Sequence, residues 1–203
     1  FIMTNENKNI IIATGGTGGH IFPAVSLANY LNKIGFISSI TTDKRGLKFI
    51  DEKIFKNVTL IDSSPFYKKQ KIISILKILL SIFNSLIFIF RTKPKFIFGM
   101  GGYASFPICF AGVLLRIPFI IYENNLLIGK TNKYLAPFAK KIFVSYEDIE
   151  GINSKYKNKV VVTGNILREN ILKHSKTKEN EINENLNILV LGGSQAAKIF
   201  AEI

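Results

Sequence analysis

The sequence predicts an α/β fold in which helices cover both faces of a doubly wound parallel sheet. Two observations lead to this fold class. Short apolar runs alternate along the chain with longer stretches that have helical apolar spacing. The short runs themselves lack an alternation of apolar and polar residues, which is typical of parallel strands that are buried on both faces. Repeated units of strand and then helix build this architecture.

Each expected element is read from its own apolar pattern, beginning with a strand over residues 9–13 and a helix over 19–34. Further strands are expected at 36–41, 58–61, 96–98, 118–122, 141–144, 160–163 and 187–191. Further helices are expected at 46–54, 72–91, 106–115 and 131–140. Helices placed between strands in this way can serve as the crossovers that a parallel sheet requires.

A polar, aperiodic stretch near the end of the chain indicates a surface connection: HSKTKENEINEN, residues 174–185. After it, NILVLGGSQAAKIF opens a further strand and helix. Roughly forty residues are too few for an independent α/β domain, since domains typically hold about 100 residues or more. We therefore expect a complete N-terminal domain over 1–163, and over 164–203 a linker with the truncated start of a second domain.

The charge balance favours anionic partners. Lys and Arg number 27 against 14 Asp and Glu, a net charge of +13. Such a charge suits nucleic acid, acidic lipid headgroups or a phosphorylated substrate, although a chain rich in Lys, Asn and Ile throughout would show it without any such partner. The lysines are scattered, with neither a basic stripe nor an aromatic stacking face, so nucleic acid is not an expected partner.

Cysteine usage and the N-terminus indicate a cytoplasmic protein. Cys109 is the single cysteine, which excludes an internal disulfide and a cysteine-based metal site. The first residues, FIMTNENKNI, lack the apolar region and cleavage site of a secretory signal. Because the chain starts with Phe1 and stops at Ile203 just after a strand-turn signal, we expect it to be a fragment.

Three expected strands end in paired glycines, in IIIATGG, IFGMGG and ILVLGG. Ligands of open parallel sheets bind at the carboxyl ends of the strands. Glycine lets the backbone approach a ligand closely, and a following helix N-terminus favours an anion. The three loops, with Gly16, Gly102 and Gly193 at their tips, therefore predict one pocket for a phosphate or a sugar.

Two familiar phosphate motifs are incomplete in these loops. The dinucleotide pattern G-x-G-x-x-G started at Gly16 meets Gly18 but then Ile21, which disfavours a nicotinamide enzyme. The GKT at 129–131 lacks the first glycine of a P-loop, because Asn124 holds that place. No carboxylate cluster calls for magnesium, so we expect neither a metal ion nor another cofactor.

Polar side chains stand beside the glycine loops. His20 lies where the first loop enters its helix, and a neutral imidazole there is a suitable general base near pH 7. The alternative is a histidine that only caps the turn. Asn124 and Asn125 follow Glu123 at a strand end, where they either hydrogen-bond sugar hydroxyls or cap the next helix. His174 lies in the polar connection and receives no role.

Five motifs follow one another along nearly the whole chain: GGTGGHIFPA, GMGGYASFP, YENNLLIGKTNKYLA, VVTGNILR and LVLGGSQAA. Together they resemble the MurG family of bacterial glycosyltransferases. The resemblance implies a GT-B fold, in which two Rossmann-like domains face each other across a cleft. It also implies a peripheral protein on the cytoplasmic face of the inner membrane that takes part in peptidoglycan synthesis.

The implied reaction is a metal-independent, inverting transfer of N-acetylglucosamine from UDP-N-acetylglucosamine. The acceptor is the 4-hydroxyl of undecaprenyl-diphosphate-linked N-acetylmuramoyl-pentapeptide, so that lipid I becomes lipid II. Because the donor site of the GT-B fold lies largely on the second domain, we expect little or no activity from this chain alone. Two alternatives are a related GT-B transferase that acts on another lipid, such as a diacylglycerol, and a non-catalytic membrane-binding remnant.

The resemblance also implies roles for single residues. His20 matches the general base proposed for the family. Contacts with the donor nucleotide are implied for Thr17, Gly18, Gly19, Asn125, Arg168 and Ser194. The acceptor diphosphate is implied to lie against loops 15–20 and 101–105, beside Gly16, Gly102 and Tyr103.

The sequence departs from the family at four positions: Asn124 replaces Gln, Leu126 replaces Gly, Ile166 replaces Pro and Ala197 replaces Gly. The first three are expected to shift local backbone freedom. The Cβ of Ala197 is expected to crowd the approach of the backbone to the nucleotide. The position of Ser194 relative to the nucleotide is therefore expected to differ from that in the family.

One long apolar stretch points to a membrane surface. Residues 72–90 carry a single charge and are nearly long enough to span a bilayer. Their polar residues form one stripe on a helix: Ser74, Lys77, Ser81, Asn84 and Ser85. This pattern favours a helix that packs on the domain and touches lipid along one flank; a buried core helix and a transmembrane span are the alternatives. Cations that bracket it suit anionic headgroups: Lys68, Lys69, Lys71, Arg91, Lys93 and Lys95.

Overall fold

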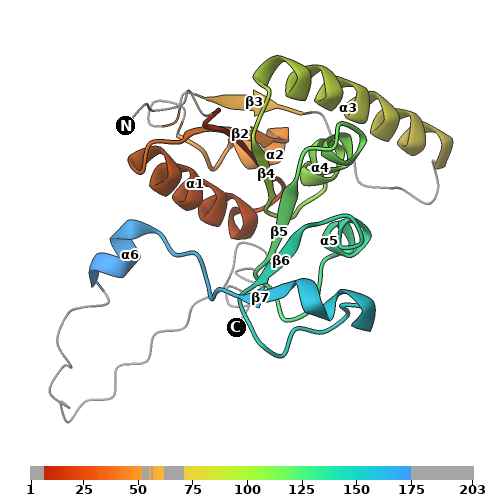
Figure 1. Cartoon of the computed structure of the whole chain (residues 1–203). Coiled ribbons are helices and arrows are strands. Elements are labelled where there is room, and N and C mark those ends of the chain that lie inside the picture. The colour runs from red at the N-terminus through yellow and green to blue at the C-terminus, as the bar shows by residue number, and fades with distance from the viewer. Residues whose placement is uncertain (1–6, 52–54, 56, 62–70, 175–203) are drawn as a thin grey trace, which may run out of the picture. The chain divides into compact units, whose positions relative to one another are not determined.

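A computed structural model describes residues 7–51, 55, 57–61 and 71–174 (Figure 1). The strands are β1 (Asn9–Ala13), β2 (Ile37–Thr42), β3 (Val58–Leu60), β4 (Phe96–Gly99), β5 (Phe119–Glu123), β6 (Lys141–Val144) and β7 (Val160–Val162). The helices are α1 (Gly18–Lys33), α2 (Lys44–Leu47), α3 (Lys71–Thr92), α4 (Ser105–Leu114), α5 (Lys130–Leu135), α6 (Glu169–His174) and the 3-10 helix η2 (Ser154–Lys159). The chain separates into two compact units, residues 1–167 and 168–203.

The described part of the first unit contains a seven-stranded sheet in the order β3-β2-β1-β4-β5-β6-β7. Every neighbouring pair is parallel. The predicted α/β fold with a doubly wound parallel sheet is therefore confirmed, and each bound of these strands lies within one residue of its prediction. The strand predicted over 187–191 lies outside the described residues.

Two predicted helices are shorter than expected. The helix predicted over 46–54 begins earlier, at Lys44, because Asp43 caps it: the carboxylate accepts a hydrogen bond from the Gly46 amide at 2.8 Å. It ends at Leu47. The helix predicted over 131–140 ends at Leu135, since Pro137 has no N–H group with which to continue the ladder.

Two short helices, η2 and α6, were not predicted. η2 directly precedes β7 in the first unit, and Asn153 caps it by accepting a hydrogen bond from the Lys155 amide at 3.0 Å. α6 belongs to the second unit and ends at His174, the first residue of the predicted surface connection. The rest of that connection lies outside the described residues.

Helices cover both faces of the sheet, with α1 on one side and α3 with α4 on the other (Figure 1). Successive residues of β1 point to opposite faces. Ile12 packs in one cluster with Ile21 of α1. Ile11 packs in the other cluster with Ile89 of α3 and Ile108 of α4. A strand buried on both faces has no polar side to show, which explains the unalternated apolar runs.

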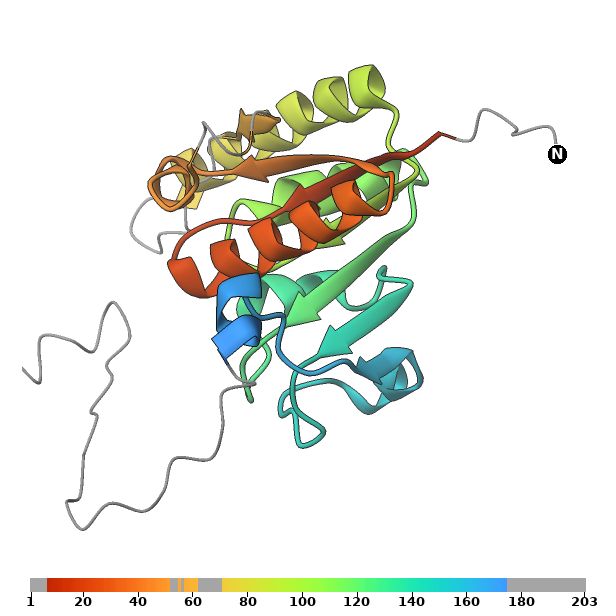
Figure 2. The same ribbon diagram turned by 90° about the vertical axis from the view of Figure 1, so that its left-hand side faces the viewer.

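The strand order positions the site. β1 lies between β2 and β4, and β5 lies next to β4. Because all of these strands run in one direction (Figure 2), their carboxyl ends emerge at one edge of the sheet. The loops that follow β1, β2, β4 and β5 are therefore neighbours in space.

The helix α3 turns its serines toward the protein. Ser74, Ser81 and Ser85 are buried, and their hydroxyls need little space where α3 packs against α4. The Ser81 hydroxyl donates to the Lys77 carbonyl at 2.8 Å, and the Ser85 hydroxyl donates to the Ser81 carbonyl at 2.7 Å. The predicted polar stripe is thus divided, since Lys77 and Asn84 are exposed while the serines are not.

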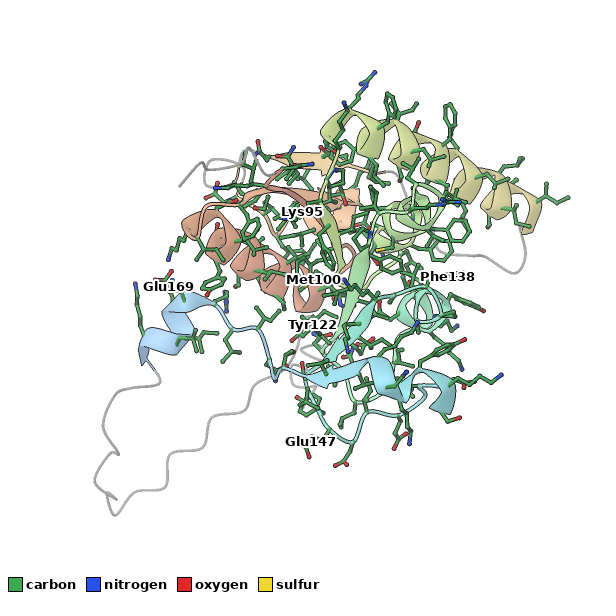
Figure 3. All side chains as sticks on the ribbon, in the orientation of Figure 1. Lys95, Met100, Tyr122, Phe138, Glu147 and Glu169 are labelled. Atoms are coloured by element: carbon green, nitrogen blue, oxygen red, sulfur yellow. The ribbon has the colours of Figure 1, made fainter. Side chains whose placement is uncertain are left out.

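The outer side of α3 exposes many large apolar side chains, which project from the helix in Figure 3. They are Ile72, Ile73, Ile75, Leu76, Leu79, Leu80, Phe83, Ile87 and Phe90. Among the described residues, one helical stretch, Ile72–Thr92, is long and apolar enough to cross a membrane, and only 28% of its apolar window is buried. A core helix would be mostly buried, so the packing of α3 within the described residues does not favour the interpretation as a plain core helix.

Candidate active site

The first two glycine loops lie against each other. A Cβ on Gly102 would stand 2.3 Å from the carbonyl oxygen of Gly15, and Gly102 has a φ of +78°. A Cβ on Gly15 would stand 2.7 Å from the Cβ of Ala104. Only glycine allows this backbone contact between the loops after β1 and β4. The structure therefore brings Gly16 and Gly102 to the same edge of the sheet, whereas Gly193 lies outside the described residues.

Asp43, at the end of β2, holds the first glycine loop. Its buried carboxylate accepts hydrogen bonds from the amide of Gly16 at 3.1 Å and from that of Gly46 at 2.8 Å. The Arg45 guanidinium donates to the other oxygen from Nε at 3.0 Å and from Nη2 at 2.7 Å. Burial raises the pKa of Asp43, but these donors together outweigh it and hold the pKa below its ordinary value. The Gly16 amide thus binds Asp43, a contact that sequence reasoning missed.

A cavity of about 210 Å³ opens at this edge of the sheet. It is lined by His20, Gly101, Gly102, Tyr103, Glu123, Asn125, Gly129, Lys130, Thr131 and Asn132. The structure therefore brings together four residues that the sequence singled out: His20, Gly102, Tyr103 and Asn125. The end of β5, the loop after it and the start of α5 contribute six of the ten lining residues.

His20 lies in the first turn of α1, and its ring packs on the second glycine loop. A Cβ on Gly101 would stand 2.9 Å from both Nδ1 and Cε1 of the ring. Within the described part of the chain, the buried Nδ1 has no hydrogen-bond partner. Burial lowers the pKa of His20 below 6.5, although the Glu123 carboxylate and the Met100 carbonyl favour the charged ring. Burial thus favours the neutral form of the imidazole.

Glu123 organises the loop that follows β5. Its Oε1 accepts hydrogen bonds from the backbone and side-chain amides of Asn125, at 3.1 and 2.7 Å. Its Oε2 accepts from the Gly129 amide at 2.8 Å and from Asn132 Nδ2 at 3.0 Å. Asn124 reaches across and donates to the Gly19 carbonyl at 2.9 Å. Neither asparagine caps the following helix, because Gly129 is the N-cap of α5. Asn124 and Asn125 bond instead to Gly19 and Glu123, and a contact with sugar hydroxyls stays a prediction.

Sequence reasoning missed Asn132. Its Nδ2 donates to Glu123 and to the Tyr122 carbonyl at 2.9 Å, while its buried Oδ1 has no partner among the described residues. Figure 3 labels Tyr122 near the end of β5 and Met100 directly after β4, the two strand ends that cavity-lining residues follow. A buried strand that ends in Glu-Asn-Asn and is followed by Gly-Lys-Thr-Asn was the available signal.

The remaining predicted residues are distributed as follows. Thr17 is the N-cap of α1 and makes no side-chain cap bond, and Gly18 and Gly19 begin the helix. Arg168 belongs to the second unit. Ser194 lies outside the described residues. In the described ranges, no group of three or more His, Cys, Asp or Glu side chains is placed to hold a metal ion.

Residues 10–144 match the N-terminal domain of glycosyltransferase family 28. The chain belongs to glycosyltransferase family 28. Among family members, the UDP-N-acetylglucosamine–N-acetylmuramyl-(pentapeptide) pyrophosphoryl-undecaprenol N-acetylglucosamine transferase of Rickettsia felis is 40% identical over 205 residues, which cover 97% of this chain and 56% of that protein. The transferase of the same name from Pelagibacter ubique is 34% identical, and the match covers 97% of this chain and 55% of that protein. The chain therefore spans just over half the length of these relatives.

Solved structures agree with this family. The crystal structure of MurG from Acinetobacter baumannii aligns with a TM-score of 0.73 and 28% identity, over 96% of this chain and 55% of that one. A UDP-N-acetylglucosamine 2-epimerase aligns with a TM-score of 0.57 at 15% identity, which is a likeness of fold alone. The resemblance drawn from the five motifs, and with it the predicted GT-B type of fold, is confirmed for this family 28 chain.

Proposed function

We propose that this protein transfers N-acetylglucosamine from UDP-N-acetylglucosamine to the 4-hydroxyl of undecaprenyl-diphosphate-linked N-acetylmuramoyl-pentapeptide, with inversion at the anomeric carbon. The transferase names of the relatives support this activity. The observation that carries the proposal is the cavity in which His20, Tyr103 and Asn125 meet beside two glycine loops. We assign residues 1–163 to the acceptor and membrane side, and 164–203 to the link with a donor-nucleotide domain.

His20 is the proposed general base. The acceptor hydroxyl loses its proton as its oxygen bonds to the anomeric carbon and UDP departs. Burial favours the neutral imidazole, which is the form that can accept that proton. Because Nδ1 is buried against Gly101, we assign Nε2 as the nitrogen that meets the hydroxyl. The Glu123 carboxylate favours the imidazolium that forms.

Backbone groups and polar side chains account for substrate binding. We assign the donor nucleotide to Thr17, Gly18, Gly19, Asn125, Arg168 and Ser194. The first three surround the N-terminal end of α1, where the helix dipole favours a diphosphate. Since Asn125 directs its NH₂ group to Glu123, its Oδ1 is left to accept from a sugar hydroxyl. We assign the acceptor diphosphate to Gly16, Gly102 and Tyr103. Because the Gly16 amide is bound to Asp43, Gly16 contributes a close backbone approach and not a donor.

We further propose that α3 lies on the cytoplasmic face of the inner membrane as a peripheral contact. Its serine side packs on α4, so the helix does not need to leave the protein in order to present its apolar side to lipid. Arg91 and Lys93 are exposed at the end of the helix, where they suit anionic headgroups. A lipid-linked acceptor would then reach the cavity from the membrane on which the protein lies.

Transfer of radiolabelled N-acetylglucosamine by the full-length gene product tests the activity. We expect a labelled lipid product from a prenyl-diphosphate-linked muramoyl-pentapeptide and none from a diacylglycerol. Product from the diacylglycerol alone would favour the alternative transferase. Vesicle binding without transfer to either acceptor would favour a non-catalytic membrane-binding protein. The 203-residue chain alone is expected to show little or no transfer.

A further inference from the structure

Arg45 lies beside the first glycine loop, outside the residues assigned above. Its side chain is 53% exposed, and a Cβ on Gly16 would lie 3.9 Å from its Nη2. Gly16 precedes the first residue of α1 by two positions. The guanidinium, which is ion-paired with Asp43, thus lies beside the loop to which we assign the acceptor diphosphate.

Only part of the hydrogen-bonding capacity of Arg45 is used. Nε and Nη2 each donate once, and both donate to the same oxygen of Asp43. Among the described residues, Arg45 makes no other hydrogen bond. A guanidinium carries five N–H donors, so three remain for another acceptor, including both on Nη1. N–H groups of this kind donate readily to phosphate oxygens.

Asp43 holds the guanidinium in place. Its carboxylate is 5% exposed and is fixed from the other side by the amides of Gly16 and Gly46. The arginine and the glycine loop therefore share one buried anchor and keep their relative positions. A side chain that is already ordered loses little rotamer entropy on binding, which favours a planar guanidinium as an anion contact.

We propose that Arg45 contacts the diphosphate of the lipid-linked acceptor, donating from its unused N–H groups to a phosphate oxygen while Asp43 holds it beside Gly16. This inference rests on the proposed function, because it names a further residue for the same acceptor. The competing explanation is that Arg45 only neutralises Asp43 and stabilises the loop.

The test measures steady-state kinetics of the full-length gene product with a water-soluble, short-prenyl diphosphate acceptor. Arg45→Gln should raise the KM for this acceptor about 10- to 100-fold, as expected for a lost charged hydrogen bond. The KM for UDP-N-acetylglucosamine should stay within about twofold. Lys44→Gln is the matched control, because it removes the same charge from the neighbouring exposed residue of α2. It should leave both KM values within about twofold.

Arg45→Lys keeps the charge without the planar fork, and should give an intermediate acceptor KM at an unchanged midpoint of thermal unfolding. An acceptor KM unchanged in both Arg45 variants overturns the inference. So does an equal rise of both KM values together with a lower unfolding midpoint, since that is the result of a structural role. If the wild-type protein does not use the acceptor at all, both the proposed function and this inference are overturned. If the wild type is active but the Arg45 variants keep its acceptor KM, only this inference is overturned.

Discussion

The buried carboxylate of Glu123 accepts a hydrogen bond from the side-chain amide of Asn132 at 3.0 Å, and both residues line the cavity that holds His20. Glu123 accepts from two residues more, Asn125 and Gly129. One carboxylate thus joins the end of β5, the loop after it and the start of α5. The cavity wall depends on an acidic side chain at this position.

Glu123→Gln should destabilise the protein. The new NH₂ group would face donors that now point at a carboxylate oxygen, which leaves buried groups without acceptors. We expect a loss of about 1–3 kcal/mol in the free energy of unfolding, measured by urea denaturation. Glu147→Gln, at an exposed position, is the matched control and should change stability by less than about 0.5 kcal/mol. Equal stability of the two variants would contradict the scaffold role of Glu123.

Gly102→Ala should separate the two glycine loops. The added Cβ would stand 2.3 Å from the Gly15 carbonyl oxygen, so the backbone of one loop must move. Gly164→Ala is the control, because Gly164 has a similar φ of +73° but nothing within 4 Å of the added atom. Gly164→Ala should lose only about 1–2 kcal/mol in the free energy of unfolding, the cost of holding a residue with a Cβ in the left-handed conformation. Thermal unfolding should place Gly102→Ala clearly below Gly164→Ala, and coinciding melting curves would refute the contact.

His20→Ala should lower kcat of the full-length enzyme by about two to four orders of magnitude, the usual share of a general base. Steady-state transfer assays measure this loss, and one of less than tenfold would remove His20 from the role. The matched control is Tyr30→Ala, at an exposed position of the same helix, which should leave kcat within about twofold.

The pH profile provides a second check on His20. A base acts in its neutral form, and burial holds the pKa of His20 below 6.5. The wild-type kcat/KM should therefore be level near pH 7 and fall only as the pH drops below 6.5 and through the lowered pKa. The residual activity of His20→Ala should lack this acidic fall. A wild-type profile that already declines from pH 8 to pH 7 would contradict a neutral His20.

Leu80→Glu should weaken binding to anionic vesicles without destabilising the fold. Leu80 is 61% exposed on α3, so the charge stays in water in the free protein but opposes insertion into lipid. Co-sedimentation should show a severalfold loss of binding. Leu172→Glu, the same change at an exposed position of α6, should have no effect. Equal binding of the wild type to neutral and anionic vesicles, or none to either, would count against the membrane surface.

Local patterns were enough for the strands and the glycine loops. An apolar run such as 9–13 has the same pattern whichever strand it pairs with, because both faces of a central parallel strand are buried. The positive φ of Gly102 is likewise a local demand that glycine meets. Hence the parallel sheet, and the prediction that Gly16 and Gly102 share one edge, could be derived from the sequence alone.

The tertiary structure decided which polar groups meet. Asp43 and Gly16 are 27 positions apart, and Asn124 and Gly19 are 105 positions apart, so neither hydrogen bond leaves a periodic trace in the sequence. The sequence also leaves open which side of α3 faces the protein, because serines suit either water or close helix packing. Only the contact with α4 shows that the serine side is packed. Sequence periodicity thus determined the elements and their order, whereas pairing between distant residues, which depends on three-dimensional proximity, determined the cavity.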